Sequence, residues 1–380
     1  MRLTQLHTGE TGTIVYHTAP RSFRKRLLEM GFVPGAKVHV IRNAPLLDPV
    51  EYSILGYRLT LRRSEAETIE VSPIESKAQS EAVSPDHLVG TPPPLAEKSL
   101  PKTKGPVANE VTVAFVGNPN CGKTSLFNAA SGSHQQVSNY AGVTVAAAVA
   151  DYRQGDTLFH LVDLPGTYSL SSYGPEEKFV THQLFESETP PDVIVNVVDG
   201  SNLERNLYMT VQLMEAGVPT IVALNMYDEL RDSGTRLDVK ALSRRLGMPV
   251  IPTIGRTGEG LRELFATVAR LHRERLDAVH LSTGPSVKYE GALRQSIEEV
   301  TRLIESETSL GDESAWLRSD FLAIKLLEQD QTLRDYVTRR DPAGARVLEQ
   351  VDEIAESHEG ADETESALEQ QLIDSRYRHI

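Results

Sequence analysis

The chain has 380 residues, of which 39% are hydrophobic and 24% charged, a composition typical of a globular protein with room for two or three domains. Its net charge of −14 argues against a nucleic-acid-binding protein, which usually carries a basic face. The single cysteine, Cys121, excludes a disulfide framework and a multi-cysteine metal site. We find no signal peptide and no apolar run approaching the ~18 residues of a membrane helix, so we expect these residues to be soluble.

Residues 1–75 carry short strand patterns separated by turn signals, which is typical of a small barrel. One segment between them has a helical pattern and is stopped by Gly31. The expected strands are "TGTIVYH" (11–17), "AKVHVIRN" (36–43), a hairpin in "VEYSILGYRLTLRR" (50–63) that turns near Gly56, and "TIEV" (68–71), with the helix in "SFRKRLLEMG" (22–31).

Residues 76–108 lose this pattern. They are rich in Pro, Ser, Lys and Glu and contain almost no aromatic residue. Such a segment cannot bury enough apolar surface to order itself, so we expect a flexible linker.

From residue 111 onward, apolar runs alternate with helical patterns. Near-continuous apolar strands separated by helices are typical of a mostly parallel sheet with helices on both faces. We therefore predict an α/β domain over 109–280, followed by an acidic, helical domain over 281–380 that holds 22 acidic and 11 basic residues. The predicted strands lie in "VTVAFVG", "LFHLVD", "DVIVNVVDG", "PTIVALN" and "MPVIPTIG".

The segment "GNPNCGKTSLFN" (117–128) follows the first of these strands and opens a helix. It matches the phosphate-loop pattern, in which glycines let the backbone N–H groups wrap a phosphate chain. We expect Lys123 to contact the β- and γ-phosphates and the hydroxyl of Thr124 to ligate Mg²⁺. The predicted nucleotide contacts in this loop are Gly117, Asn118, Pro119, Asn120, Cys121, Gly122, Lys123, Thr124 and Ser125.

The stretch "DLPGTYSL" (163–170) lies about forty residues further on, at a strand end. We expect Asp163 to hold Mg²⁺ through water and Gly166 to offer its N–H to the γ-phosphate, with Leu164 and Pro165 beside the nucleotide. Many GTPases place a glutamine after that glycine to orient the attacking water, whereas this chain has Thr167. The stretch therefore raises the question of how water is positioned.

The tetrapeptide "NMYD" (225–228) follows the strand "PTIVALN" and favours guanine over adenine. The carboxylate of Asp228 can accept two hydrogen bonds from guanine, while Asn225 can tie the base-binding loop to the phosphate loop, with Met226 between them. The weaker match "PTIGRTGEG" (252–260) is expected to close the base pocket through the N–H of Gly255, together with Thr253 and Ile254.

A mobile switch is expected between the phosphate loop and the acidic strand end. The segment "NYAGVTVA" (139–146) supplies Thr144, which we expect to close on Mg²⁺, preceded by the nucleotide-contacting residues Gly142 and Val143.

Taken together, "GNPNCGKTSLFN", "GVTV", "DLPGTYSL", "PEEK" and "NMYD" resemble the cytosolic GTPase domain of the ferrous iron transport protein B family. Residues 281–380 resemble the helical domain that follows it in that family, often compared to a nucleotide-dissociation inhibitor. Residues 1–75 resemble the companion protein A, an SH3-like barrel. The resemblance implies a Ras-like P-loop GTPase domain between an N-terminal SH3-like β-barrel and a C-terminal all-α domain.

The resemblance also addresses Thr167, because members of that family lack the glutamine. It implies that water is positioned by backbone groups and by Glu176 and Glu177 in the "PEEK" segment, and that Asn120 holds K⁺ beside the phosphates. The chain departs from the common pattern at Tyr140–Ala141, where Trp–Pro is frequent. Without a glutamine or an arginine finger we expect slow hydrolysis.

The function implied by the resemblance is that of a GTPase that drives or regulates Fe²⁺ uptake by a membrane permease domain outside these residues, at the cytoplasmic face of the bacterial inner membrane. Its expected ligands are GTP, GDP, Mg²⁺ and K⁺, and its partners are that permease domain, other proteins of the same system or a second copy. Two alternatives stay open. One is a soluble GTPase of ribosome assembly or tRNA modification, although the acidic C-terminal region does not favour nucleic acid as a partner. The other is a non-catalytic nucleotide-binding scaffold.

Overall fold

The computed structural model describes residues 1–43, 48–54, 57–74, 110–132, 136–139, 146–171, 174–187, 189–277, 287–310, 317–358 and 367–380. The chain divides into two compact units, residues 1–96 and 97–380. The expected linker at 76–108 lies outside the described residues. The same holds for the predicted switch residues Gly142, Val143 and Thr144.

The first unit contains a five-stranded antiparallel sheet in the order β4-β3-β2-β1-β5. Successive side chains of a strand point to opposite faces, so one face of this sheet is buried. Along β3, Val50, Tyr52 and Ile54 are buried, while the residues between them are half-buried. This sheet fits the predicted SH3-like fold. Its elements are η1 (Leu3–Gln5), β1 (Thr11–His17), α1 (Arg21–Glu29), β2 (Lys37–Asn43), β3 (Val50–Ile54), β4 (Tyr57–Leu61), α2 (Arg63–Ala66) and β5 (Ile69–Ile74).

The second unit is built on a seven-stranded sheet in the order β12-β11-β10-β6-β9-β8-β7. The strands from β12 to β9 are parallel, whereas β8 and β7 pair antiparallel at one edge. The five parallel strands confirm the predicted α/β class, and the two antiparallel strands were not predicted. The strands are β6 (Glu110–Gly117), β7 (Gln136–Asn139), β8 (Ala146–Gln154), β9 (Thr157–Asp163), β10 (Val193–Asp199), β11 (Thr220–Asn225) and β12 (Val250–Pro252).

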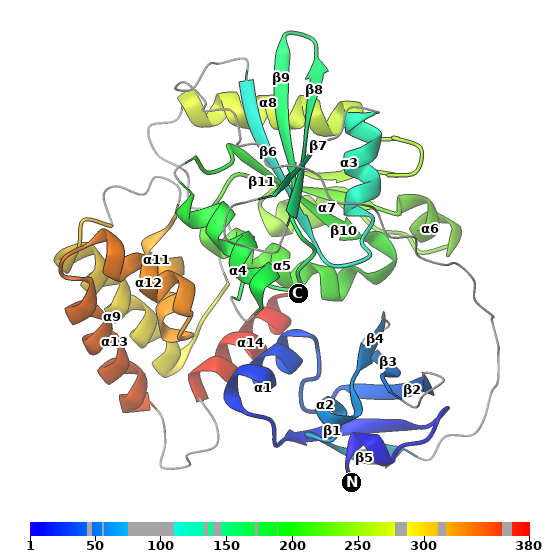
Figure 1. The fold of residues 1–380 in the computed structure, drawn as a ribbon, viewed down its shortest axis with the longest axis vertical. Helices are drawn as coiled ribbons and strands as arrows, with labels where there is room; N and C mark the ends of the chain where they lie inside the picture. The colour runs from blue at the N-terminus through cyan, green and yellow to red at the C-terminus, as the bar shows by residue number, and fades with distance from the viewer. Residues whose placement is uncertain are drawn as a thin grey trace. The chain divides into compact units, whose positions relative to one another are not determined.

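Helices cover both faces of this sheet (Figure 1). The alternation along β6 shows the two layers, because Val113 and Phe115 pack with α3 and α8, while Ala114 and Val116 pack with α4 and α5. Helix α7 joins α5 on the second face. The helices are α3 (Lys123–Ser131), α4 (Pro175–Thr181) with a π-helical turn at His182–Glu186, α5 (Leu203–Ala216), α6 (Tyr227–Asp232), α7 (Val239–Leu246) and α8 (Leu261–Asp277).

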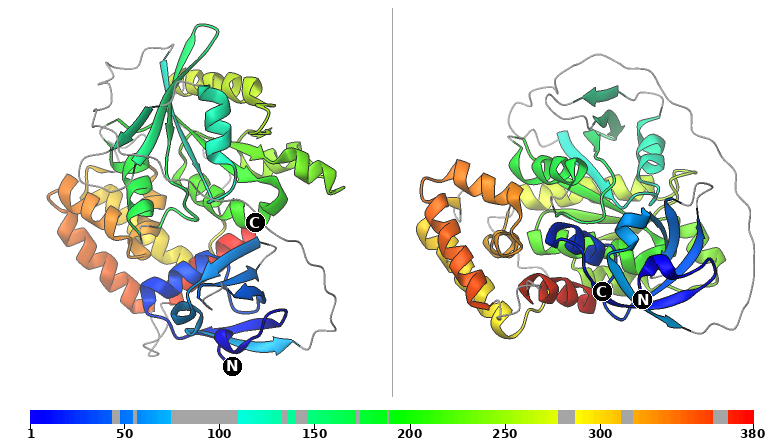
Figure 2. Two further views of the ribbon diagram at one scale, coloured as in Figure 1. Left: turned by 45° about the vertical axis from the view of Figure 1, so that its right-hand side comes forward. Right: turned by 60° about the horizontal axis from the view of Figure 1, so that its bottom comes forward.

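The described residues beyond 287 are mainly helical, as predicted. Figures 1 and 2 show α9, α11, α12 and α13 grouped together, and α11 lies at their core because every residue from Phe321 to Leu327 is buried. Their apolar core is continuous with the α4–α5 face of the sheet. The helices are α9 (Gly291–Glu307), α11 (Ser319–Leu327), α12 (Gln331–Arg340), α13 (Gly344–His358) and α14 (Ala367–His379).

A group of buried charges joins α5 to these C-terminal helices. We call Glu215, Lys325, Glu328 and Arg376 the junction cluster. Arg376 is fully buried, with Nη2 2.8 Å from Oε2 of Glu215 and Nη1 2.5 Å from Oε1 of Glu328, while Nζ of Lys325 lies 2.9 Å from Oε2 of Glu328. Although burial opposes its charge, these two carboxylates hold the pKa of Arg376 well above its ordinary value.

Candidate functional site

The predicted nucleotide-binding segments follow four parallel strands. Strand β6 ends at Gly117, β9 at Asp163, β11 at Asn225 and β12 at Pro252. Because the carboxyl ends of parallel strands meet at one edge of the sheet, the four segments are brought together there, where ligands of open α/β sheets bind. The site is therefore assembled from segments that are up to 135 residues apart in the sequence.

The loop after β6 needs its two glycines for steric reasons. At Gly117, with φ of +156°, a Cβ would lie 2.5 Å from the carbonyl oxygen of Val197. At Gly122, with φ of +79°, it would lie 2.3 Å from Nδ2 of Asn225. Helix α3 begins directly after Gly122, so its unpaired N–H groups and the positive end of its dipole lie at this loop. Such a loop is suited to binding a phosphate chain.

Three side chains meet at the phosphate end of the site. The ammonium of Lys123 donates to Oδ1 of Asp163, and the hydroxyl of Thr124 donates to Oδ2 of the same carboxylate at 3.0 Å. Lys123 and Asp163 are each 8% exposed. A hydroxyl and a carboxylate placed together are the oxygen ligands that Mg²⁺ takes, with phosphate oxygens and water completing its shell. These residues fit the predicted metal.

The "DLPG" segment runs beside the phosphate loop. A Cβ on Gly166 would lie 3.2 Å from Cα of Pro119, and the N–H of Thr167 donates to the carbonyl of Gly117 at 3.2 Å. The side chain of Leu164 is buried in the apolar core and so anchors the segment to it. Pro165 and Gly166 are half-buried.

The side chain of Thr167 is 1% exposed, and its hydroxyl donates to the carbonyl of Ser169 at 2.8 Å. The hydroxyl is therefore engaged within its own segment. This geometry agrees with the expectation that Thr167 does not replace a water-orienting glutamine.

The residues after Thr167 are fixed to the neighbouring helices. The N–H of Leu170 donates to Oε1 of Gln212 at 2.7 Å, and the guanidinium of Arg205 lies 4.0 Å from the ring centre of Tyr168. Nζ of Lys325 lies 3.4 Å from Oγ of Ser171, which links this segment to the junction cluster. The segment thus runs from the phosphate loop to the C-terminal helices.

On the base side, Asn225 links three segments. Its Nδ2 donates to the carbonyl of Cys121 at 2.9 Å, and its Oδ1 accepts the N–H of Gly255 at 2.8 Å. Asn225 therefore ties the phosphate loop to the loop that is expected to close over the base, and the N–H of Gly255 already has a partner within the protein. Thr253 and Ile254, which precede Gly255 in its loop, are buried. Met226, which follows Asn225, adopts a left-handed conformation with φ of 54°.

The other predicted residues take varied positions. The thiol of Cys121 is buried, and burial raises its pKa to about 12, so it is not a reactive cysteine. Pro119, Asn120, Thr124 and Ser125 are exposed. Glu176 is exposed, whereas Glu177 accepts the N–H of Gly174 at 3.0 Å and so caps α4.

Two features of the site were not predicted. Asn118 is 4% exposed, and neither amide atom of its side chain has a hydrogen-bond partner among the described residues. Arg256 forms an ion pair with Asp228. The glycine-rich loop contains two asparagines, Asn118 and Asn120, so a separate role for the Asn118 amide could have been suspected from the sequence. No sequence signal marks Arg256.

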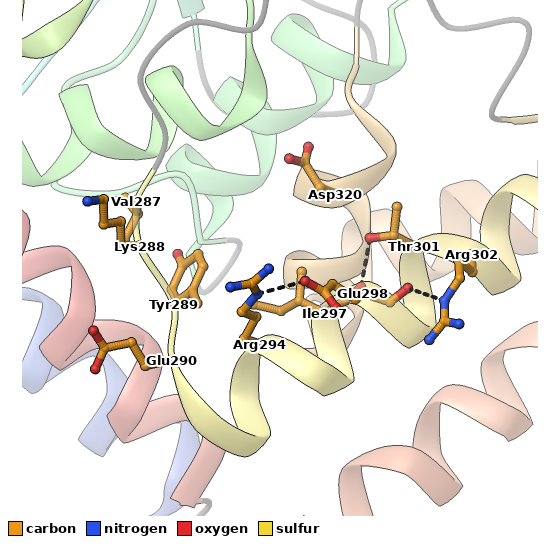
Figure 3. Close-up of a pocket in the computed structure, with 10 residues that line it drawn as sticks. All are labelled: Val287, Lys288, Tyr289, Glu290, Arg294, Ile297, Glu298, Thr301, Arg302 and Asp320. Atoms are coloured by element: carbon orange, nitrogen blue, oxygen red, sulfur yellow. Dashed lines mark hydrogen bonds and ion pairs between the residues drawn. The ribbon is translucent and has the colours of Figure 1, made fainter.

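Another cavity, of about 970 Å³, lies outside this site, where α9 faces the segment before it (Figure 3). Its polar groups bond mainly along α9: Nε of Arg294 donates to Glu298 at 2.7 Å, and Nε of Arg302 donates to the carbonyl of Glu298 at 3.1 Å. The polar groups of these lining residues therefore do not point toward one common position for a ligand. The cavity is lined by Val287, Lys288, Tyr289, Glu290, Arg294, Ile297, Glu298, Thr301, Arg302 and Asp320.

Within the described ranges, no cluster of three or more His, Cys, Asp or Glu side chains could hold a metal ion. Over the same ranges, no helix has the length and apolar character needed to cross a membrane. The glycine-rich loop, the Lys123–Asp163–Thr124 contacts and the parallel sheet define a P-loop nucleotide-binding protein.

Three family models match successive parts of the chain. Residues 1–73 match the FeoA domain, residues 111–268 match ferrous iron transport protein B, and residues 289–380 match the FeoB cytosolic helical domain. A solved NFeoB structure matches at 33% identity over 97% of its own length. The chain therefore belongs to the ferrous iron transport protein B family, with a FeoA domain at its N-terminal end.

Two solved structures illustrate the similarity. One is a GDP-bound NFeoB variant from S. thermophilus, 33% identical, which covers 71% of this chain and 97% of its own with a TM-score of 0.58. The other is the cytosolic domain of the T. maritima FeoB iron transporter in its GMPPNP form, 27% identical, which covers 71% of this chain and 95% of its own with a TM-score of 0.58.

Curated relatives are longer than the chain. It is 43% identical over its whole length to the Fe(2+) transport protein A/Fe(2+) transporter FeoB fusion protein of Porphyromonas gingivalis, of which it covers 46%. It is 37% identical, over 65% of its length, to the Fe(2+) transporter FeoB of Escherichia coli, of which it covers 31%. The chain thus spans less than half the length of these relatives.

Proposed function

We propose that the chain is the GTP-binding and GTP-hydrolysing cytosolic portion of a ferrous iron uptake transporter. The observation that carries this proposal is the contact of Lys123 and Thr124 with Asp163 at the end of the glycine-rich loop. The two solved relatives hold GDP and GMPPNP, and the relative that matches the whole chain is a fusion of Fe(2+) transport protein A with the Fe(2+) transporter FeoB. Similarity to that fusion over the whole chain does not favour a GTPase of ribosome assembly or tRNA modification.

Each part of the site has a distinct task in this proposal. Apart from Pro119, which has no N–H, the backbone N–H groups from Asn118 to Thr124 bind the phosphates together with the ammonium of Lys123. For this, Lys123 leaves Asp163 to contact the β- and γ-phosphates. Thr124, Asp163 and Thr144 would hold Mg²⁺, which neutralises charge on the phosphate oxygens when bound. The N–H of Gly166 binds the γ-phosphate.

Water positioning falls to backbone groups near Gly166 and to Glu176 and Glu177. Because Glu177 already caps α4, its carboxylate must leave the N–H of Gly174 to reach a water molecule. Asn120 would hold K⁺, a fixed positive charge in the place of an arginine finger. With these groups alone, intrinsic hydrolysis is expected to be slow.

The base is bound by Asp228 and Asn225, with the loop that contains Thr253, Ile254 and Gly255 closing over it. We propose domain limits of 1–75, 109–280 and 281–380, joined by a linker at 76–108. The partner is the permease domain of the same transporter, which places this portion at the cytoplasmic face of the cell membrane.

Phosphate release tests the enzymatic part of the proposal. The chain should hydrolyse GTP and not ATP, faster in potassium than in sodium chloride, and Asn120→Ala should remove the potassium gain while GTP still binds. Absence of GTP hydrolysis by the wild type would overturn the GTPase assignment, and equal rates in the two salts would overturn the role of Asn120.

Growth tests the transport part. A gene that encodes this chain joined to its permease domain should restore ferrous iron uptake to a bacterial strain deleted for its own ferrous iron transporter, and the Lys123→Ala variant should not. Failure of a well-expressed wild-type gene to restore uptake would contradict the transport assignment.

A further inference from the structure

The carboxylate that is expected to recognise guanine is already paired in this structure. Nη2 of Arg256 lies 2.8 Å from Oδ2 of Asp228, and the Asp228 side chain is 17% exposed whereas that of Arg256 is 80% exposed. The two residues come from the two different base-binding segments. The ion pair therefore crosses the place where the base is expected.

The backbone directs Arg256 toward this carboxylate. The carbonyl of Ile254 accepts the N–H groups of Thr257 at 3.1 Å and of Gly258 at 2.8 Å, which closes a tight turn around Arg256. The turn is held in place because Gly255 donates to Asn225, and a Cβ on Gly255 would lie 3.0 Å from the backbone nitrogen of Leu126. The backbone of the turn is therefore braced, whereas the exposed side chain of Arg256 has room to move.

The chemistry of the pair resembles that of base recognition. A guanidinium presents adjacent N–H donors in one plane and commonly binds a carboxylate through them. Guanine offers the same kind of edge, with its ring N–H next to its amino group. Both groups therefore use the same acceptor, and Asp228 cannot give Oδ2 fully to both.

We propose that Arg256 competes with guanine for Asp228 and thereby sets how readily nucleotide enters the site, an inference that rests on the guanine binding proposed above. Nucleotide entry requires the guanidinium to swing away into solvent. Its 80% exposure makes this movement sterically simple, so Arg256 acts as a removable occupant of the base site.

The expected effect is modest, because exposed ion pairs contribute little to stability. Loss of the pair should strengthen mant-GDP binding by about two- to fivefold at low salt, mainly through faster association. Salt screens exposed charges, so the gain should shrink toward none at about 1 M salt. A merely structural role of Arg256 would instead weaken binding at every salt concentration.

The test is stopped-flow and equilibrium binding of mant-GDP to the full chain as wild type, Arg256→Ala and Arg262→Ala. Arg262 is an exposed arginine six residues further along the chain, so its variant removes the same charge without touching Asp228. We expect a salt-sensitive gain for Arg256→Ala and none for Arg262→Ala.

Equal or weaker binding by Arg256→Ala, or the same gain in both variants, would overturn the role of Arg256 while guanine binding stands. Absence of mant-GDP binding by the wild type would instead overturn the guanine site itself, and the competition with it.

Discussion

The predicted nucleotide-binding loops and the junction cluster both bury polar side chains. The two regions differ in the partners that these side chains have. In the junction cluster, the guanidinium of Arg376 meets the carboxylates of Glu215 and Glu328. In the phosphate loop, the buried amide of Asn118 has no partner among the described residues. Because an unpaired buried polar group costs free energy, we expect the Asn118 amide to gain a partner from a ligand or in another state of the loop.

The comparison separates stability from function. Buried charges that meet opposite charges fix one arrangement of helices, whereas the loops hold charges that we expect a nucleotide to take over. Lys123 shows the difference, since its partner Asp163 is also an expected metal ligand. Substitutions in the two regions should therefore change different measurements.

The largest effect is expected in the junction cluster. Arg376→Ala leaves the buried carboxylate of Glu215 without its cation and removes one of the two cations beside Glu328, so it should lower the free energy of unfolding by about 3–5 kcal/mol. Arg376→Lys should lose less, because it keeps the charge without the planar fork. Denaturant unfolding measures this, with the exposed Arg378→Ala as control. A loss for Arg376→Ala no larger than for Arg378→Ala would mean that the cluster does not fix the helices.

Lys123→Ala tests the other side of the comparison. It removes a cation from the phosphates, and single-turnover GTP hydrolysis should fall by about 10²- to 10³-fold. The circular dichroism spectrum should stay native. The exposed Lys240→Ala on α7 is the control and should keep the wild-type rate. Full turnover by Lys123→Ala would refute the assignment of the phosphate loop.

Asp228→Asn should weaken GTP binding by about 10- to 100-fold, because charged hydrogen bonds to the base are lost. Xanthosine triphosphate should gain in relative affinity, since its base accepts where guanine donates. Competition binding with both nucleotides measures the change. If both nucleotides bind the variant as they bind the wild type, Asp228 does not read the base.

Thr167→Ala should produce the smallest change in function. Because its hydroxyl bonds to Ser169 within the segment, the hydrolysis rate should stay close to that of the wild type, while stability falls by about 1 kcal/mol. Single-turnover kinetics and denaturant unfolding on one preparation measure both. A fall in rate comparable to that of Lys123→Ala would show that Thr167 positions water after all.

Much of this organisation could be predicted from the sequence. The five parallel strands are continuous apolar runs, and their ends carry the glycines, Lys123, Asp163 and Asn225 that the site requires. Strands β7 and β8 were missed because β8 begins with three consecutive alanines, which have low strand propensity, and owes its place to pairing with β9.

Contacts between distant residues could not be predicted. Arg376 lies 161 residues from Glu215, and nothing in the local pattern of α14 distinguishes this buried arginine from the exposed Arg378. The pairing of Arg256 with Asp228 is hidden for the same reason, since it depends on how two loops approach. The position of Glu177 three residues after Gly174 is compatible with a helix cap, but the prediction for Glu177 was only the role with water that the resemblance implies.

Calorimetric titration of Mg·GDP into three forms of the full chain tests the separation of the two regions most directly, at a temperature where each form is folded. Wild type should bind GDP and not ADP. Lys123→Ala should lose most of this affinity, and Arg376→Ala should retain it despite its lower stability. Absence of GDP binding by the wild type, or loss of binding in Arg376→Ala with full binding in Lys123→Ala, would contradict the account.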